Sequence, residues 1–294
     1  MAGIDVNRTT SGIVLTPEQS AEIWSAAEYE SAVMRLATKV DLPGPGVSVD
    51  ILTGEPEAEW VNETDEKPVS RPTFGSKLMT PYTAAVIVPF SNQFRRDKSR
   101  LYAEVVRKLP QALARKFDQT VFGAKSGAPG DNFDTIGEAT KVGISGGTYA
   151  GLIAADQAVA TGGGSLNGWA LSPQARGLLL GAVDGQGRPL FINNIQNDGA
   201  VPALLGAPVY QTKAVYAQGT PNVLGFAGDW SSAHFGVVEN INLSIATEAT
   251  VTDGGKQLNL WQRNMFAVRA EFEVGFRVRD INHFTALTDA KQGE

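Results

Sequence analysis

The sequence predicts an α+β fold, and three observations support this prediction. Residues 91–125 carry apolar side chains at steps of three, four and seven, which is the spacing of one long helix with a buried stripe. Residues 268–278 alternate apolar and charged side chains, as a strand does when one of its faces lies on a core. Two strand-like runs, 47–52 and 84–88, enclose a long polar excursion that has little apolar surface to bury.

The N-terminal segment contains too many breaks to form a core. Thr16 and Pro17 are suited to be the N-cap and first residue of a helix that runs to about residue 29. Residues 33–40 read as a strand, and prolines and glycines follow immediately. We therefore interpret residues 1–46 as an arm.

The long helix of residues 91–125 has recognisable ends. Ser91 or Asn92 can cap its start, and Gly123 can end it. A helix of ~30 residues would span ~45 Å. Pro110 lies inside it, so we expect a bend nearby.

A second region of short elements follows a glycine-rich connection. Its helices are expected to be stopped by glycines, and its strands to lie between turns. The predicted helices are residues 148–160 and 173–183, and the predicted strands are 169–171, 208–211, 222–226 and 241–245.

Charge is unevenly distributed along the chain. Residues 55–66 contain six acidic and no basic residues, whereas residues 91–125 contain nine basic and three acidic ones. An isolated two-stranded ribbon is marginally stable in water, so the acidic ribbon needs another surface. Our hypothesis is that it lies on the basic helix of a second copy of the chain. The alternative is that both segments are solvated faces, which is common for charge runs.

The overall composition excludes several classes of protein. The 294 residues suffice for one large or two moderate domains, and there is no cysteine for a disulfide or a thiolate site. No apolar run is long enough for a transmembrane helix, and no secretory signal precedes the chain's first elements. The net charge of −6 argues against nucleic-acid binding as the main activity.

Two motifs suggest chemistry only weakly. Residues 122–127 resemble a phosphate-binding loop, but they lack the Gly-Lys pair and they end a helix instead of beginning one. Asp229, Ser231 and His234 have the residue types of a hydrolase triad. Neighbours in sequence seldom have triad geometry, and a polar turn before a strand is the favoured interpretation.

Glu271 and Glu273 lie on one strand face and could form a carboxylate pair. Arg269 and Arg277 stand beside them, which favours an ion-pair ladder. Tryptophans are scattered along the chain, so they are interpreted as core or interface anchors. They are Trp24, Trp60, Trp169, Trp230 and Trp261.

The order of these pieces resembles the major capsid proteins of tailed bacteriophages. The likeness covers roughly residues 20–288, and it depends on short phrases whose order is more specific than any one of them. These phrases are residues 32–37, 58–63, 67–70, 77–79, 84–91, 206–209 and 225–231.

The resemblance implies the tailed-phage major capsid fold, with an N-arm, an extended loop, a peripheral domain built on a spine helix, and an axial domain. The corresponding ranges are 1–46 for the arm, 47–90 for the extended loop, 91–134 for the spine helix of the peripheral domain, 135–248 for the axial domain, and 249–294 for the closing strands of the peripheral domain and the C-terminus.

In this family the extended loop lies across a neighbouring subunit, which agrees with the hypothesis drawn from charge. The expected loop contacts are Glu57, Glu59, Trp60, Glu63, Asp65, Glu66, Lys67, Arg71 and Lys77. The expected partners on the neighbour's spine helix are Arg95, Arg96, Arg100 and Arg107.

The resemblance further implies a structural role without catalysis, cofactor, metal or membrane. Copies of the chain would assemble as hexamers and pentamers into an icosahedral virion shell, formed in the host bacterial cytoplasm around double-stranded DNA that is contacted non-specifically. A portal, a decoration protein and a separate scaffolding protein are the other expected partners. The alternative is an encapsulin-like compartment shell, which shares the fold.

Some family members link their subunits through a Lys–Asn isopeptide bond assisted by a glutamate. Lys67 or Lys77, with Asn264 and Glu271, are the conceivable participants in this chain. No pattern singles them out, so non-covalent locking of subunits is the expectation.

Overall fold

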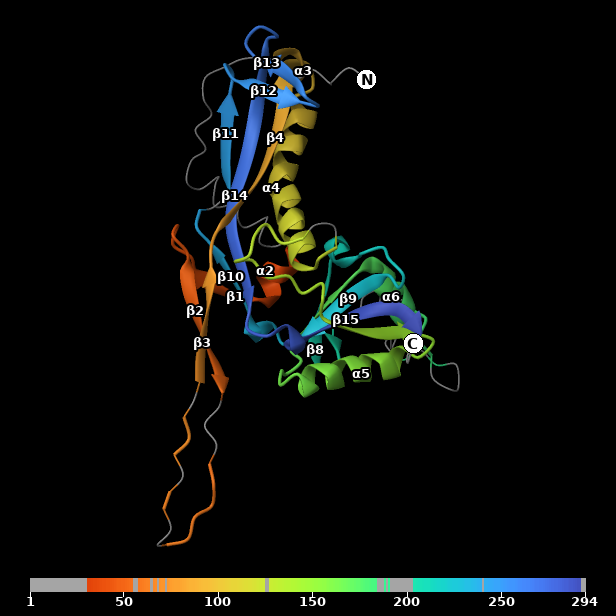
Figure 1. Cartoon of the computed structure of the whole chain (residues 1–294). Coiled ribbons are helices and arrows are strands. Elements are labelled where there is room, and N and C mark those ends of the chain that lie inside the picture. Colours follow the sequence, from red (N-terminus) through yellow and green to blue (C-terminus); the bar gives the residue numbers. More distant parts are fainter. Residues whose placement is uncertain are drawn as a thin grey trace.

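The structure is a computed structural model in full atomic detail. It describes residues 31–54, 58–63, 66–67, 69–71, 73–124, 127–183, 188, 190, 203–239 and 241–291. The helix expected at residues 16–29 lies outside these ranges. Figure 1 shows an elongated body of one long helix beside long strands, a rounder body of shorter elements, and a hairpin that points away from both.

The elongated body is organised around β14 (Met265–Val278). β4 (Tyr82–Ser91) pairs antiparallel with β14, from Met265 opposite Ser91 to Val274 opposite Tyr82. β11 (Asn242–Ala246) lies on the other edge of β14, β10 (Ala233–Val237) pairs with the end of β14, and β1 (Thr38–Asp41) runs parallel to β10. The predicted alternation is confirmed, because the even-numbered residues from Val268 to Val278 are buried.

The basic helix is two helices, α3 (Asn92–Asp97) and α4 (Ser99–Val121). The prediction of one unbroken helix was wrong at Lys98, whose φ of −131° and ψ of 45° are not helical. Asn92 is held by two hydrogen bonds to Asn264, and Phe94 and Tyr102 both pack on the core, so the chain turns between them.

The end of α4 follows the sequence prediction. Gly123 has a φ of +66°, a conformation that glycine adopts without strain, and the helix ends just before it. Pro110 lies within α4 without ending it. The apolar stripe of α4 packs on β14, and Phe117 makes edge-to-face contacts with Phe272 and Phe276 at 6.3 and 6.2 Å between ring centroids.

The rounder body contains a six-stranded sheet with two helices, α5 (Thr148–Thr161) and α6 (Pro173–Leu180). α5 confirms the predicted helix, whereas α6 ends three residues earlier than predicted. Leu152, Trp169, Leu179 and Leu287 are fully buried between these helices and the sheet. The strand order is β5 (Thr140–Ser145), β15 (Phe284–Lys291), β9 (Val223–Gly228), β6 (Gly168–Leu171), β8 (Ala207–Gln211) and β7 (Ala203–Leu204).

The two sheets do not divide at the boundary expected at residue 248. β10 and β11 precede that boundary but pair with β14, and β15 follows it but pairs with β9 and β5. The chain turns after β14 through the short helix η3 (Ile281–His283) and enters the second sheet. In the six-stranded sheet, β15 lies between β5 and β9, and its residues Phe284, Ala286 and Leu287 are fully buried.

The described part of the arm corrects another prediction. Residues 33–40 were expected to form one strand, but Ala32–Leu36 form the helix α2, and only Thr38–Asp41 form a strand. Ser31 caps α2 by accepting a hydrogen bond from Met34 N, 3.2 Å away. A short capped helix buries Ala32, Val33 and Met34 together, which a strand would not.

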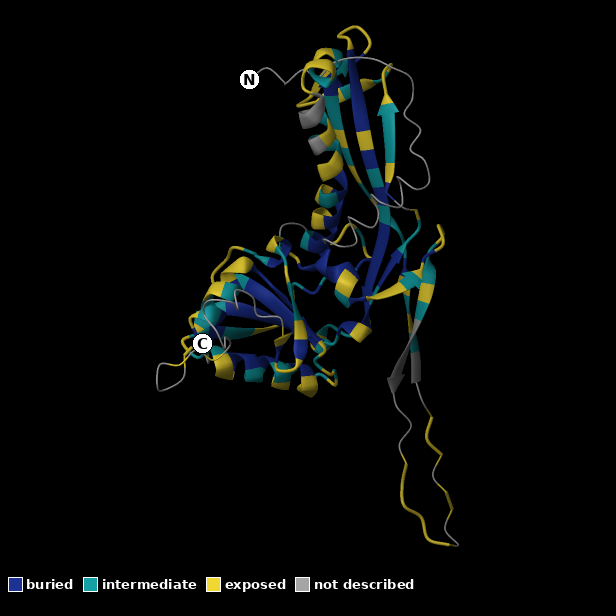
Figure 2. Cartoon of the chain, turned by 180° about the vertical axis from the view of Figure 1, so that it is seen from behind, coloured by how far each residue is buried: buried dark blue, intermediate teal, exposed yellow. Residues whose placement is uncertain are grey.

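Two hairpins extend from the elongated body. β2 (Val47–Gly54) pairs with β3 (Thr73–Met79), with Val47 opposite Met79 and Gly54 opposite Thr73. Beyond the paired residues of this hairpin, residues 58–63 project away from the body (Figures 1 and 2). β12 (Thr250–Asp253) and β13 (Lys256–Asn259) form the second hairpin near α3, at the opposite end of β14 (Figure 1).

Candidate intersubunit surfaces

The first candidate surface is the loop tip, defined as residues 58–63. Every residue of the loop tip is exposed, and Trp60 is the most exposed large apolar side chain among the described residues. Glu66, Lys67 and Arg71, which follow the tip, are exposed as well. Glu57 and Asp65 lie outside the described residues. A fully exposed tryptophan among acidic residues is typical of a protein–protein binding surface.

The base of the hairpin is fixed to the chain's own body. Lys77 Nζ donates a hydrogen bond to the carbonyl oxygen of Val278, 2.7 Å away, and lies 3.5 Å from a carboxylate oxygen of Asp134. The ammonium group of Lys77 thus has two partners in its own chain, and the expected contact of Lys77 with a neighbouring subunit stays a prediction. Sequence reasoning missed these partners because Lys77 and Val278 are about two hundred residues apart.

Arg277 completes this anchor from the other side. Its Nε donates to the carbonyl oxygen of Leu78 at 2.8 Å, and its two terminal nitrogens donate to Asp134 at 2.7 Å and to Asn132 at 2.8 Å. The side chain is only 10% exposed. Arg277 was expected to join a ladder with the strand glutamates, but it holds β3 and residues 132–134 against β14.

The second candidate surface is the basic side of α3 and α4. Arg95 lies over the rings of Tyr102 and Phe266, at 5.7 and 5.6 Å from their centroids, and is therefore held against its own chain. Arg96 forms an ion pair with Asp97 at 2.6 Å. Arg107 is exposed, whereas the side chain of Arg100 lies outside the described residues. The exposed bases of α4 extend further than predicted and include Lys108, Arg115 and Lys116.

The residues considered for a cross-link are not brought together within one chain. Lys77 contacts Val278, the last residue of β14, whereas Asn264 immediately precedes Met265, the first residue of this strand. Asn264 has a φ of +54° and pairs with Asn92. Glu271 pairs with Arg269 at 3.1 Å, which confirms the ion pair expected on this strand face.

A buried carboxylate that sequence reasoning missed holds the arm on α4. Asp118 accepts hydrogen bonds from Ser31 Oγ at 2.6 Å and from Ala32 N at 3.0 Å. Burial raises the pKa of Asp118 to about 7, although the hydrogen bonds from Ser31, Ala32 and Val33 act to lower it. The available signal was a lone acid next to Phe117, within the apolar stripe of the helix.

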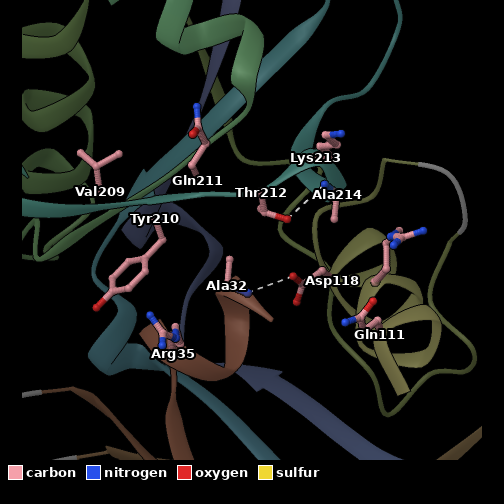
Figure 3. A pocket seen from close by; sticks show the side chains of 11 residues that line it. Ala32, Arg35, Gln111, Asp118, Val209, Tyr210, Gln211, Thr212, Lys213 and Ala214 are labelled. Atoms are coloured by element: carbon pink, nitrogen blue, oxygen red, sulfur yellow. Dashed lines mark hydrogen bonds between the residues drawn. The ribbon is translucent and has the colours of Figure 1, made fainter. Parts of the chain in front are cut away.

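A cavity of about 550 Å³ lies beside this contact, between α2, α4, β8 and η1 (Lys213–Val215). Figure 3 shows Arg35 lying near the ring of Tyr210, and the dashed line from Ala32 to Asp118 marks the contact that holds the arm. Arg35, Arg115 and Lys213 make the lining basic.

The candidate triad is a polar turn, as the favoured interpretation predicted. Asp229 caps the short helix η2 (Trp230–Ser232) and accepts hydrogen bonds from Ser231 Oγ, Ser165 N and Asn167 Nδ2. Burial acts to raise the pKa of Asp229, but hydrogen bonds from Ser231 and Ser165, together with the charge of His283, outweigh it, and the pKa lies below its usual value. Burial also lowers the pKa of His234, which lies on β10.

Nowhere in the ranges that the structure describes do three His, Cys, Asp or Glu side chains gather as a metal site requires. Within the same ranges, no helix combines the length and apolarity needed to span a membrane.

The chain is similar in sequence to phage capsid proteins. The model of the phage capsid family matches residues 11–289. The chain is 31% identical over 296 residues to the "Probable major capsid protein gp17" of Mycobacterium phage D29, covering 95% of this chain and 91% of that protein. It is 31% identical over 298 residues to the protein of the same name from Mycobacterium phage L5, covering 95% of this chain and 90% of that one.

Solved structures show the same fold. A chain of Gordonia phage Cozz superposes with a TM-score of 0.74 at 23% identity, covering 90% of this chain and 87% of that one. A chain of the "Capsid of empty GTA particle computed with C5 symmetry" superposes with a TM-score of 0.63 at 14% identity, covering 99% and 96%. The fold is thus that of the tailed-phage major capsid proteins. With the family model matching nearly its whole length, this chain belongs to the phage capsid family.

Proposed function

We propose that this major capsid protein closes an icosahedral virion shell by laying the extended loop of each subunit on the spine helix of the next. The helices α3 and α4 with the five-stranded sheet are assigned as the peripheral domain, and the six-stranded sheet with α5 and α6 as the axial domain. The shell would contain hexamers and pentamers. Its role is structural, as expected of the family.

The observation that carries the proposal is the isolation of the loop tip. The hairpin projects beyond the body of its own chain, and its tip residues are exposed (Figure 2). A two-stranded ribbon without a surface beneath it is marginally stable in water. In a chain of the phage capsid family, the available surface is a second copy.

Charge supports the spine helix as the docking surface. The acidic residues Glu59, Glu63 and Glu66 are exposed around the tip, and exposed bases line α4. A single exposed ion pair contributes only ~0–1 kcal/mol. Many such contacts act together in a closed shell, so each subunit is held although each contact is weak. Weak individual contacts also let misplaced subunits leave during assembly.

The proposed partners beyond the chain itself are a portal, a separate scaffolding protein, a decoration protein and double-stranded DNA that is contacted non-specifically, with assembly in the host bacterial cytoplasm. The named relatives are phage proteins, which favours a phage head over an encapsulin-like compartment. The net charge of −6 suits a wall past which packaged DNA must slide.

The direct test is electron microscopy of the purified chain across protein concentration and ionic strength. We expect closed polyhedral shells, or rings of five and six subunits. A chain that remains monomeric under every assembly condition, with and without its genomic neighbours, would contradict the proposal.

A charge exchange tests the docking surface. The triple variant Glu59→Lys, Glu63→Lys and Glu66→Lys should not assemble, because like charges then face each other. Adding Lys108→Glu and Lys116→Glu to it should restore part of the assembly. The matched control reverses three exposed acids elsewhere, Glu138, Glu248 and Asp253, and should assemble like the unaltered chain. Equal loss in both triple variants would refute the docking surface.

A further inference from the structure

A groove on the elongated body has the shape and chemistry to receive an aromatic side chain. It lies between β4, α4 and the loop around Phe133, and its volume is about 430 Å³. Its walls are mostly apolar, and several of their residues, including Ala85 and Ala112, are exposed. The full lining is Tyr82, Thr83, Ala84, Ala85, Val86, Ala112, Leu113, Lys116, Phe117, Thr120, Pro129, Phe133 and Val274.

The wall of the groove is held in place by its own contacts. Phe133 lies edge-to-face with Tyr82 at 6.1 Å and with Phe117 at 6.2 Å between ring centroids. The hydroxyl oxygen of Tyr82 accepts a hydrogen bond from Asn132 N at 3.2 Å. An incoming ring therefore meets a preorganised aromatic surface, and such surfaces favour edge-to-face contact with a further ring.

The electrostatics of the groove select the kind of segment that enters it. Lys116 lines the groove and is exposed at its rim. A ring carried by an acidic segment would be attracted to this rim, whereas one carried by a basic segment would be repelled.

Two tryptophans in the described residues are exposed, and only one meets this requirement. Trp60 is fully exposed beside Glu59, with Glu63 three residues on. Trp261 is 72% exposed, but Arg263 follows it two residues later. Figure 1 shows the hairpin of β2 and β3, with the loop tip beyond it, directed away from α4 of its own chain, so the groove that Trp60 enters must belong to another subunit.

We infer that the indole of Trp60 of one subunit inserts into the groove between β4 and α4 of a neighbouring copy, with Glu59 and Glu63 facing Lys116. This inference rests on the proposed function and names the anchor of the docking. A tryptophan that fills a pocket at the centre of an interface typically dominates its binding energy. Trp60→Ala should therefore raise the protein concentration needed for assembly roughly 30-fold, and Trp60→Phe should raise it much less.

The absence of cysteine from the sequence permits a direct test by disulfide trapping. The variant carrying Trp60→Cys and Ala112→Cys is assembled and oxidised, and then separated by denaturing electrophoresis without reductant. We expect a ladder of covalently linked subunits. The matched control carries Trp261→Cys and Ala112→Cys, and neither it nor any single-cysteine variant should form a ladder.

The outcomes separate this inference from the proposed function. Shells without a ladder would overturn the Trp60 docking while leaving the shell proposal intact. A ladder from rings or open oligomers that never close would support the docking and count against the closed shell. Soluble protein that forms no ladder at any concentration would overturn the docking as well.

A second variant covers the case in which the double-cysteine chain does not fold. Ala112→Trp fills the groove from an exposed helix position, so the subunit should fold but assemble at least roughly tenfold less readily. Its control is Ala103→Trp, at an exposed position of α4 outside the groove. Equal assembly of the two variants would refute the docking.

Discussion

At the scale of single residues, Asp118 makes the stability of the subunit depend on pH. Its folded pKa is about 7, whereas an unperturbed aspartate titrates near ~3.9. Between these values the folded chain binds a proton that the unfolded chain lacks. The free energy of unfolding therefore falls as pH rises from ~4 to ~7, by ~4 kcal/mol, and changes no further above that range.

Asp118→Asn should remove this dependence, because the amide resembles the protonated carboxyl in shape and charge. The melting temperature of the variant minus that of the unaltered chain should rise between about pH 5 and pH 8. Thermal unfolding of dissociated subunits across this range measures the difference. Asp131→Asn, at an exposed position, is the control and should show no such trend. A difference that does not vary with pH would mean that Asp118 is ionised throughout.

At the scale of the elements, the hairpin projects at a defined angle because its base is fixed to β14. Arg277 and Lys77 tie β3, the end of β14 and residues 132–134 into one hydrogen-bonded unit. This network stabilises several elements together, because the guanidinium group of Arg277 donates hydrogen bonds to oxygens of Leu78, Asp134 and Asn132.

Two arginines of β14 provide a matched comparison of buried and exposed charge. Arg277→Ala should lower the free energy of unfolding by ~3 kcal/mol, because it removes the three hydrogen bonds that a nearly buried guanidinium group donates. Arg269→Ala removes a largely exposed pair with Glu271 and should cost only ~0–1 kcal/mol. Urea unfolding of the subunits measures both. Arg277→Lys should be intermediate, since an ammonium group cannot make the same three bonds. Equal costs for the two alanine variants would contradict this account.

Some elements were predictable from the sequence because their signals are local. β14 alternates strictly, and α5 ends where a run of glycines begins, so both were identified. α2 and the break at Lys98 were not, because each depends on distant partners. α2 is held by Asp118, and the start of α3 is held by Asn264.

At the scale of the whole molecule, two interleaved bodies carry one projecting loop. β15 returns to the six-stranded sheet after β14 has completed the five-stranded one, so the bodies cannot be cut apart at a single point in the chain. Both α4 and the base of the hairpin are packed on or bonded to β14, so the groove and the hairpin base keep fixed relative positions. A subunit of this kind presents its loop and its docking surface at the same time.

Charge complementarity between subunits predicts a specific response to salt. Sodium chloride shortens the screening length from ~8 Å at physiological ionic strength to ~3 Å at 1 M, so the concentration needed for assembly should rise with salt. The triple variant Glu59→Gln, Glu63→Gln and Glu66→Gln should need more protein at low salt and respond less to added salt. Light scattering across a salt series measures both slopes. Identical slopes would show that these glutamates take no part in docking.

The sequence alone determined the α+β class, the basic helical region that contains α4, the alternating strand and the charge contrast between loop and helix. These follow from periodicity and composition, which act over a few neighbouring residues. Only the tertiary structure decided that Lys77 serves its own chain, that Asp118 holds the arm, and that a groove opens beside α4. Each of these joins segments separated by many residues. Their pairing depends on the packing of the whole chain, which no local pattern encodes.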